Sequence, residues 1–523
     1  MKNRPDTLET LSRDQLIDVL LQQNSRIDSL EKTLENKVAF YEAQLRLLAA
    51  QKYGARSERQ TNDLQSDLFN EAEVLVDKAD EQLKSSETET ITYERQKKRG
   101  RVAIDPALPR TDIIHDIPEA DKTCACGCQK NQIGDERSER LDYVPPQLTV
   151  ERHIRYKYAC PACEEGVQIA DRPASLLPKS NAAPGLLAYV VTAKYQDSLP
   201  LYRQSKILAR HGVTVPSNTL ANWMIKVSEA VAPVIDLMAQ QIKQVPVILM
   251  DETTLQVNKE PDKKASSKSY MWIRRGLSPP DPDHPHGKDM TLFHYSPSRK
   301  AQVAVDLLSG YQGALMTDGY DGYNAAIKEH RLQHANCWAH ARRKFIEAEK
   351  SLPKGKKSPA ITAILNEIGK LYGIEKTIKP MLADDKQTER QAKAKPILEK
   401  LKTNLNNKLQ TVTPKSKLGE AIAYTLKYWE GLITYLENGY IPIDNNGAEN
   451  GIRPFVIGRK NWLFSDTVKG AEASARLYSI IETAKANGHE PYHYLRLLFT
   501  QLPEAKTEQD MINLLPWNVK RDY

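Results

Sequence analysis

The stretch Val245-Pro-Val-Ile-Leu-Met250, followed by Asp251-Glu-Thr253, decides the fold class of this chain. A short apolar run before an acidic residue is typical of a buried strand. Two more strands are expected at Ser269–Arg274 and Met290–Tyr295. A helix at Ala301–Leu308 and a strand at Gly313–Thr317, which leads into Asp318, follow them. This order predicts a mixed α/β layout.

Asp251 and Asp318 each end an apolar strand, so on neighbouring strands both carboxylates would leave the sheet at one edge. A third acid, Glu449, lies in a segment expected to be helical, which Pro454 should end or kink. One face of that helix carries Asn446, Glu449, Asn450 and Arg453. Three carboxylates suit hard cations such as Mg²⁺, and two such ions support in-line attack on a phosphodiester.

Each of these acids has a competitor nearby, and a lone acid is more often a cap or turn residue. The competitors are Glu252, Asp321 and Asp444. Glu252 should point to the opposite face of its strand, and Asp321 lies beyond a strand end, so we rank them lower. Three acids in such contexts favour catalysis over three separate caps.

Five of the six cysteines lie between Cys124 and Cys163, a spacing that favours a metal site over disulfides. Cys160-x2-Cys163 has the spacing of a zinc knuckle, whereas the first cluster offers three sulfurs for two positions. We favour Cys124 and Cys126, with Cys128 spare; free thiols are the alternative. Four thiolates make the zinc structural, and residues 141–158 between the pairs are expected to form two strands around Pro145-Pro146.

The N-terminal segment has apolar residues in heptads, at Leu20, Ile27, Leu34, Tyr41 and Leu48. This pattern predicts a coiled coil that self-associates, the alternative being a helix packed on its own domain. Residues 62–101 are polar and end in a basic run that includes Arg99 and Arg101. That run is either a minor-groove contact or a solvated linker.

Residues 199–226 have the pattern of a helix-turn-helix: a helix to Arg210, a turn at His211-Gly212, and a second helix from Pro216-Ser217. The groove-facing residues would be Ser217, Asn218, Asn222 and Lys226. An ordinary helical hairpin is the alternative. Further on, helices are expected at Asn336–Glu349, at Ser358–Asn438, and at Gly470–Asn487, an amphipathic helix capped by Gly488.

The composition is that of a globular protein, with 40% hydrophobic and 27% charged residues, which excludes a disordered tail. A net charge of +7 permits nucleic acid as a partner without requiring it. No run approaches the ~18 apolar residues of a membrane span, and the N-terminus is polar. We therefore expect a cytoplasmic protein with no membrane partner.

The chain resembles transposases of the insertion sequence 66 family, a bacterial DDE-type group, over nearly its whole length. The motifs that carry the resemblance are Lys52–Arg59, the cysteine pairs with Leu141–Pro145, Leu199–Gln204, Asp251–Thr253, Thr317–Tyr320, Cys337–Phe345, Asp444–Pro454 and Leu514–Trp517. The first cysteine pair departs from the C-x2-C of many relatives, which leaves that ligand pair open. The run Cys337-Trp-Ala-His-Ala-Arg-Arg-Lys-Phe345 is the most specific of these motifs.

The resemblance implies a ribonuclease-H-like catalytic core in which Asp251, Asp318 and Glu449 form a DDE triad that holds two Mg²⁺ ions, with Mn²⁺ as a substitute. It places Cys337 and His340 near the active site, together with Asn446, Asn450 and Arg453. It also implies a helical insertion at about 350–440. The expected domains are 1–60 (coiled coil), 61–110 (linker), 111–178 (zinc-binding), 179–240 (helix-turn-helix), 241–487 (catalytic) and 488–523 (helical tail).

The implied function is transposition: binding of terminal inverted repeats, nicking to expose 3′-hydroxyls, and joining of these ends to target DNA. Phosphate contacts are expected from Arg342, Arg343, Lys344, Arg453, Arg459 and Lys460. The partners would be DNA, further copies of the chain and companion proteins of the same element, with the protein at the nucleoid. The alternatives are a metal-dependent nuclease that does not join ends and a non-catalytic zinc-containing DNA-binding protein.

Overall fold

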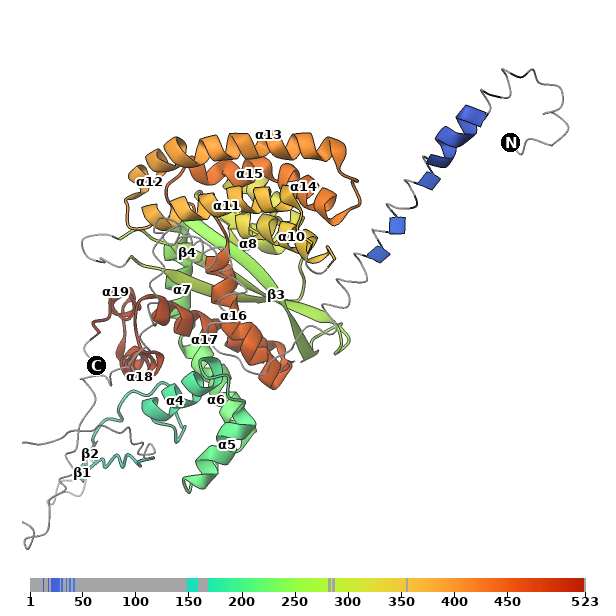
Figure 1. Cartoon of the computed structure of the whole chain (residues 1–523). Helices are drawn as coiled ribbons and strands as arrows, with labels where there is room; N and C mark the ends of the chain where they lie inside the picture. Colours follow the sequence, from blue (N-terminus) through green and yellow to red (C-terminus); the bar gives the residue numbers. More distant parts are fainter. Residues whose placement is uncertain are drawn as a thin grey trace, which may run out of the picture. The chain divides into compact units, whose positions relative to one another are not determined.

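The computed structural model describes residues 148–158, 168–280, 284, 287–353 and 356–521, together with residues 13, 17, 20–28, 30, 31, 34, 37, 38, 41 and 42 of an N-terminal helix (Figure 1). The five clustered cysteines, the basic residues Arg99 and Arg101, and the whole of the expected linker lie outside the described residues. Among residues 148–158, only β1 (Lys157–Tyr158) is a strand, and it pairs antiparallel with β2 (Gln168–Ile169). Residues 148–156 form no strand, so this part of the expected strand pair is wrong.

A mixed sheet forms the centre of the fold, in the order β5-β4-β3-β6-β7. Its strands are β3 (Val247–Lys259), β4 (Lys268–Leu277), β5 (Met290–Ser296), β6 (Ala314–Thr317) and β7 (Gln333–Asn336). Strand β4 pairs antiparallel with both β5 and β3, whereas β6 pairs parallel with both β3 and β7. The expected mixed layout is confirmed, although β7 was not predicted.

Strand β3 does not end at Asp251 as the apolar run indicated. It continues to Lys259 because β4 pairs with it as far as Gln256, well beyond the end of β6. The final residues of β3 then pair in parallel with β8 (Ser465–Thr467). Asp251 therefore lies inside a long strand, at the point where its parallel neighbour stops.

Three helices flank the parallel strands β6 and β7. Helix α8 (Ala301–Leu307) lies between β5 and β6, α9 (Asn324–His330) connects β6 to β7, and α10 (Trp338–Lys350) follows β7. The helix at 301–308 was predicted, whereas α9 was not. Helix α10 begins two residues later than expected because Asn336 ends β7.

Helix α16 (Asn446–Trp462) lies close against the sheet, and Pro454 does not end it. A Cβ atom on Gly447 would lie 2.8 Å from Leu249 Cδ2, and one on Gly451 would lie 2.8 Å from Ile273 Cδ1. Glycine at these two positions lets the helix backbone approach β3 and β4. The expectation that Pro454 ends the helix is wrong, because the helix continues for eight residues beyond it.

In helix α17 (Val468–Ala486), residues 477–484 are all buried, so the expected amphipathic character is wrong over this part of the helix. It contacts β5 as well as α4, α6 and α18. Its hydroxyls complete the hydrogen bonding of β5, an edge strand: Ser479 Oγ accepts from Phe293 N–H at 2.8 Å, and Thr483 Oγ1 accepts from Thr291 N–H at 3.0 Å. Gly488 follows the helix with φ +77°, as its expected capping role requires.

The helices before and after the sheet share its hydrophobic core. They are α4 (Pro184–Tyr195), α5 (Leu201–Arg210), α6 (Ser217–Ala230), α7 (Ala232–Gln241), α18 (Pro491–Gln501) and α19 (Glu508–Asn513). The two helices expected in the helix-turn-helix are confirmed as α5 and α6. One apolar cluster includes residues on both sides of the boundary expected near residue 240.

The helical character expected for residues 358–438 is confirmed, and these helices lie between α10 and α16 in the chain. This segment consists of α11 (Pro359–Ile378), α12 (Ala383–Glu389), a π-helix (Arg390–Ala394), α13 (Lys395–Thr411), α14 (Lys417–Lys427) and α15 (Trp429–Ile433). Trp338 joins it to α10, because its Nε1 donates to Leu432 O at 2.8 Å and its ring meets Trp429 edge-on. In the part of the chain that the structure describes, no helix has the length and apolarity needed to cross a membrane.

We predict that Trp338→Phe lowers the free energy of unfolding by about 1–3 kcal/mol, because the buried carbonyl of Leu432 loses its donor. Urea denaturation of the full chain measures this loss. The exposed Tyr440 is the matched control, and Tyr440→Phe should change stability little. Equal stability of both variants would show that Trp338 does not hold the insertion.

Candidate active site

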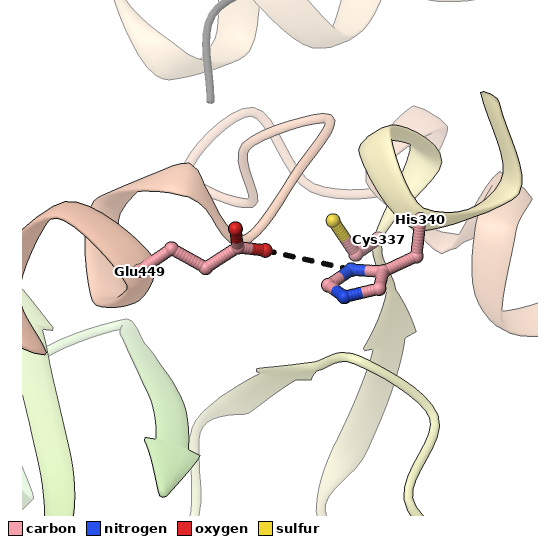
Figure 2. A group of neighbouring side chains, drawn as sticks. All are labelled: Cys337, His340 and Glu449. Atoms are coloured by element: carbon pink, nitrogen blue, oxygen red, sulfur yellow. Dashed lines mark ion pairs between the residues drawn. The ribbon is translucent and has the colours of Figure 1, made fainter. Parts of the chain in front are cut away.

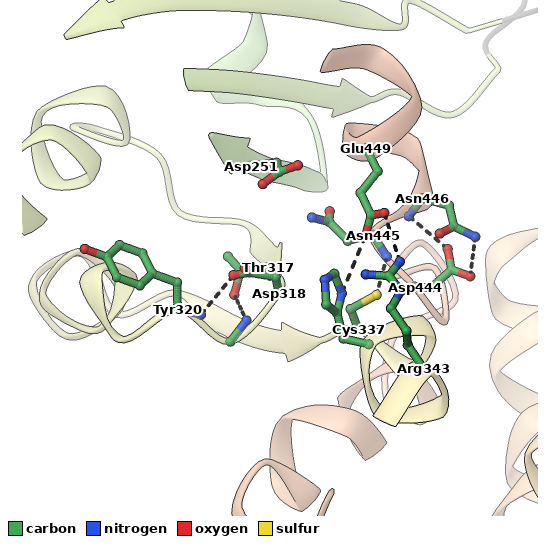
Figure 3. A network of polar contacts seen from close by, with 12 residues as sticks. Asp251, Thr317, Asp318, Tyr320, Cys337, Arg343, Asp444, Asn445, Asn446 and Glu449 are labelled. Carbon is green, nitrogen blue, oxygen red and sulfur yellow. Dashed lines mark hydrogen bonds and ion pairs between the residues drawn. The ribbon is translucent and has the colours of Figure 1, made fainter. Parts of the chain in front are cut away.

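Asp251 and Asp318 lie side by side at the edge where β6 ends. The parallel register pairs Val247 with Ala314 and Leu249 with Met316, so two residues further on Asp251 comes beside Asp318. Each carboxylate accepts one local backbone N–H: Asp251 from Glu252 at 2.8 Å and Asp318 from Tyr320 at 2.9 Å. Figure 3 shows both acids with the neighbouring polar network.

Glu449, the third acid, comes from the first turn of α16 and is 6% exposed. Asn445, immediately before the helix, fixes its position. Asn445 Nδ2 donates to Met250 O at 2.9 Å, and its backbone N–H donates to Cys337 Sγ at 3.1 Å. One fully buried asparagine thus ties the start of α16 to the residue before Asp251 and to the start of α10 (Figure 3).

Asn445 is a functional residue that sequence reasoning did not single out. The available signal was an asparagine before a helix in a polar run, which is also the pattern of an ordinary cap. Its side chain does not cap α16, however; it reaches across to β3. Only the tertiary structure distinguishes these two roles.

Asp318 and Glu449 lie close enough to Asp251 to affect its ionisation. Burial raises the pKa of Asp251 well above its usual value, and the charges of Glu252, Asp318 and Glu449 raise this pKa further. Simultaneous ionisation of the four acids around this strand segment is therefore unfavourable. A bound cation would relieve this repulsion.

Two side chains of α10 face Glu449. Arg343 Nη2 lies 3.4 Å from Glu449 Oε2 (Figure 3), and His340 Nδ1 lies 3.5 Å from Glu449 Oε1 (Figure 2). Burial lowers the pKa of His340 although Glu449 opposes this shift, so the imidazole is neutral at neutral pH. Arg343 therefore supplies the positive charge next to Glu449.

Cys337 immediately precedes α10 and is 1% exposed. Burial, followed by the charges of Asp444 and Glu449, raises the pKa of its thiol well above the usual value. Its sulfur, His340 and Glu449 offer ligand atoms that all lie within 4.8 Å of one another. The structure thus brings both members of the expected C-x2-H motif to the third acid.

The competing acids are engaged elsewhere. Glu252 accepts hydrogen bonds from Arg299 and from the Tyr323 hydroxyl. Asp444 accepts from the Tyr372 hydroxyl at 3.0 Å and from Asn446. Asp321 is exposed and lies 3.7 Å from Lys427. Each competing acid therefore has a side-chain partner of its own.

The expected DNA-contacting residues are not all accessible. Arg342 is only 5% exposed, so its side chain is not presented for the expected phosphate contact. It lies on the same face of α10 as the buried Trp338 and Phe345, four residues after one and three before the other. Arg459 is partly buried and donates to the hydroxyls of Thr253 and Thr254.

Other expected contacts lie at or near the surface. Arg343 and Lys344 are partly exposed, and the Lys344 ammonium stands 4.6 Å from the centre of the Tyr424 ring. Arg453 and Asn446 are also partly exposed. The exposed positions are Ser217, Asn218, Asn222 and Lys226 on α6, and Asn450 and Lys460 on α16.

The donor set fits a hard divalent cation. Asp251, Asp318 and Glu449 supply carboxylate oxygens, the ligands that Mg²⁺ prefers. Among the described residues, Glu449 Oε1 and Asn446 Oδ1 are buried without a hydrogen-bond partner. A buried acceptor without a donor is costly, and a cation or its water would satisfy it.

The sequence matches four family descriptions. Residues 179–473 match the Transposase IS66 family, residues 121–164 the zinc-finger binding domain of transposase IS66, and residues 479–517 the IS66 C-terminal element. Residues 41–113 match the description Transposase C of IS166 homeodomain. The zinc-finger match supports a structural zinc ion in the segment that contains the clustered cysteines.

Similar proteins occur in Sinorhizobium fredii (strain NBRC 101917 / NGR234). The uncharacterized protein y4jD is 34% identical over 450 residues, which cover 82% of this chain and 85% of the relative. The uncharacterized protein y4qI is 32% identical over 516 residues, which cover 95% of this chain and 92% of the relative. On these matches, the chain belongs to the IS66 family of transposases.

Proposed function

We propose that this protein is a DDE transposase in which Asp251, Asp318 and Glu449 hold two Mg²⁺ ions, with Mn²⁺ as a substitute. The observation that carries the proposal is the register of β3 and β6, which puts Asp251 beside Asp318 within reach of Glu449. A single acid in such a place would be a turn residue. Three acids from three separate elements form a binding site.

The proposal includes a ribonuclease-H-like core. The strand order supports it, because three antiparallel strands are followed by two parallel ones, with short helices between the parallel strands. In this arrangement the first long strand is central and carries the first acid. The third acid comes from a helix placed against the sheet, after the insertion.

The reaction has two steps at one site. In the first, a water oxygen attacks the phosphorus at an element end, and the bond to the 3′-oxygen breaks to leave a 3′-hydroxyl. In the second, that hydroxyl oxygen attacks a phosphorus of the target DNA and displaces its 3′-oxygen. Mg²⁺, when bound, would supply activation of the attacking oxygen and stabilisation of the leaving one.

The protein's own part is to hold the acids and to place the DNA. Asn445 and the close approach of α16 keep Glu449 at the end of β6. Arg343 balances the charge of Glu449, and Lys344, Arg453 and Lys460 are accessible for phosphate contacts. Arg459 would first have to release the two threonine hydroxyls.

Recognition of the inverted repeats is assigned to α6 and the zinc-binding segment. Ser217, Asn218, Asn222 and Lys226 lie along one exposed face of α6, as a groove-reading helix requires. Assembly is assigned to the N-terminal helix. Its described heptad residues Leu20, Ile27, Leu34 and Tyr41 are each 49–64% exposed within the single chain, so another copy would bury them.

The central test is a nicking assay on a supercoiled plasmid that carries this gene with both native flanks. We expect Mg²⁺- or Mn²⁺-dependent nicks in the flanks with 3′-hydroxyl ends, and a loss of at least 100-fold in Asp318→Asn, because one metal ligand is weakened. Asp321→Asn is the matched control and should nick like the wild type.

Three other outcomes would contradict the assignment. Equal nicking by Asp318→Asn and the wild type would show that the triad is not catalytic. Nicks without any joining of 3′-ends to a second DNA would favour a nuclease. Binding of the flanks without any nick, in the presence of companion proteins, would favour a non-catalytic DNA-binding protein.

A second prediction concerns α6. Lys226→Ala should weaken binding to the element ends and reduce the slope of log affinity against log salt by about 0.9, the value of one lost phosphate contact. Gel shifts at several salt concentrations measure this slope. Lys415→Ala, an exposed lysine on the insertion, should leave the slope unchanged. An unchanged slope in Lys226→Ala would remove α6 from the DNA interface.

A third prediction concerns the N-terminal helix. The double variant Ile27→Asn/Leu34→Asn should lower the oligomeric state of the full chain, because two apolar contacts of the proposed seam are lost. Light scattering coupled to size exclusion measures the mass. Gln22→Asn/Ser25→Asn, on the opposite face of the same helix, is the control and should keep the wild-type mass. A helix that serves only its own chain would give equal masses for all three proteins.

A further inference from the structure

We propose that Cys337, His340 and Glu449 form a second metal site, selective for a thiophilic divalent cation such as Zn²⁺. The ligand atoms of these three residues lie within 4.8 Å of one another (Figure 2). They come from two elements: Cys337 and His340 from the start of α10, and Glu449 from the first turn of α16. This site is separate from the proposed zinc knuckle, whose cysteines are elsewhere in the sequence.

The geometry fits a tetrahedral ion. His340 Nδ1 and Glu449 Oε1 lie 3.5 Å apart. Two such atoms bound to one Zn²⁺ at about 2.0–2.1 Å would be about 3.3 Å apart. Within the described part of the chain, both atoms are buried and neither has a hydrogen-bond partner. Two buried ligand atoms without hydrogen-bond partners therefore face the same point.

The chemistry of the three ligands selects the ion. A sulfur and an imidazole nitrogen are poor ligands for Mg²⁺ and good ligands for Zn²⁺ or Co²⁺. The N–H of Asn445 already donates to Cys337 Sγ at 3.1 Å, an outer hydrogen bond of the kind that orients a metal-bound sulfur. Three protein ligands leave a fourth position for water or a phosphate oxygen.

The site has a consequence that rests on the proposed function. Glu449 belongs to both sites, so a zinc ion held by Cys337 and His340 would take this carboxylate from the Mg²⁺ set. Zinc should then inhibit Mg²⁺-dependent nicking. The C-x2-H motif would thereby make the nuclease sensitive to thiophilic metal.

Metal content of the full-length chain tests the site without any measure of activity. After saturation with Zn²⁺ and removal of free metal, we expect the wild type to hold one more zinc per chain than Cys337→Ser or His340→Gln. His211→Ala, which removes an exposed histidine, is the matched control and should hold the wild-type number. Metal-free protein reconstituted with Co²⁺ should give a thiolate charge-transfer band that is weaker in Cys337→Ser than in the wild type.

Equal zinc content in the wild type and both variants would overturn the proposal. His340→Gln guards against misfolding as the cause of any loss, because the His340 side chain is 25% exposed and glutamine keeps its polarity. Circular dichroism and the melting temperature of each variant verify its fold. In the nicking assay, zinc should inhibit the wild type more than Cys337→Ser, with each rate compared to the zinc-free rate of the same protein. A protein that does not nick in Mg²⁺ would count against the proposed function. The zinc content would still decide whether the second metal site exists.

Discussion

Repulsion among Asp251, Asp318 and Glu449 is the constraint on which the rest of the structure depends. Two like charges 4 Å apart repel by about 4 kcal/mol at an effective dielectric constant of about 20. A whole domain is stable by only about 5–15 kcal/mol. Burial is the main cause of the raised pKa of Asp251, and the charges of Glu252, Asp318 and Glu449 raise this pKa further. A fold that keeps these groups together must hold them rigidly, and it gains from a cation between them.

The surrounding elements supply that rigidity. Strand β3 is held on both sides, by β4 over ten residue pairs and by β6 up to the position of the acids. Gly447 and Gly451 let α16 approach the sheet, and Asn445 fixes where the helix starts. Helix α17 covers β5 and completes its hydrogen bonding, so the far edge of the sheet is also fixed. Trp338 joins the insertion to α10, which carries Arg343 and His340.

The sequence could predict what depends on local pattern: the strands before Asp251 and Asp318, the helix of Glu449, the paired helices around Gly212, and the insertion. It could not predict what depends on tertiary packing. The length of β3 is set by β4, and the burial of α17 by the layers on both sides of it. Arg342 is buried because its face of α10 is buried, although arginine is usually found at the surface. Asn445 resembles a cap until β3 is placed beside it.

The most direct test of the central claim is a crystal structure of the protein soaked with Mn²⁺, in which anomalous scattering locates the ion. The account predicts a manganese peak within bonding distance of the carboxylates of Asp251 and Asp318, with Glu449 at the same site. A peak bound elsewhere, or none at these acids under conditions in which the protein cuts DNA, would contradict it.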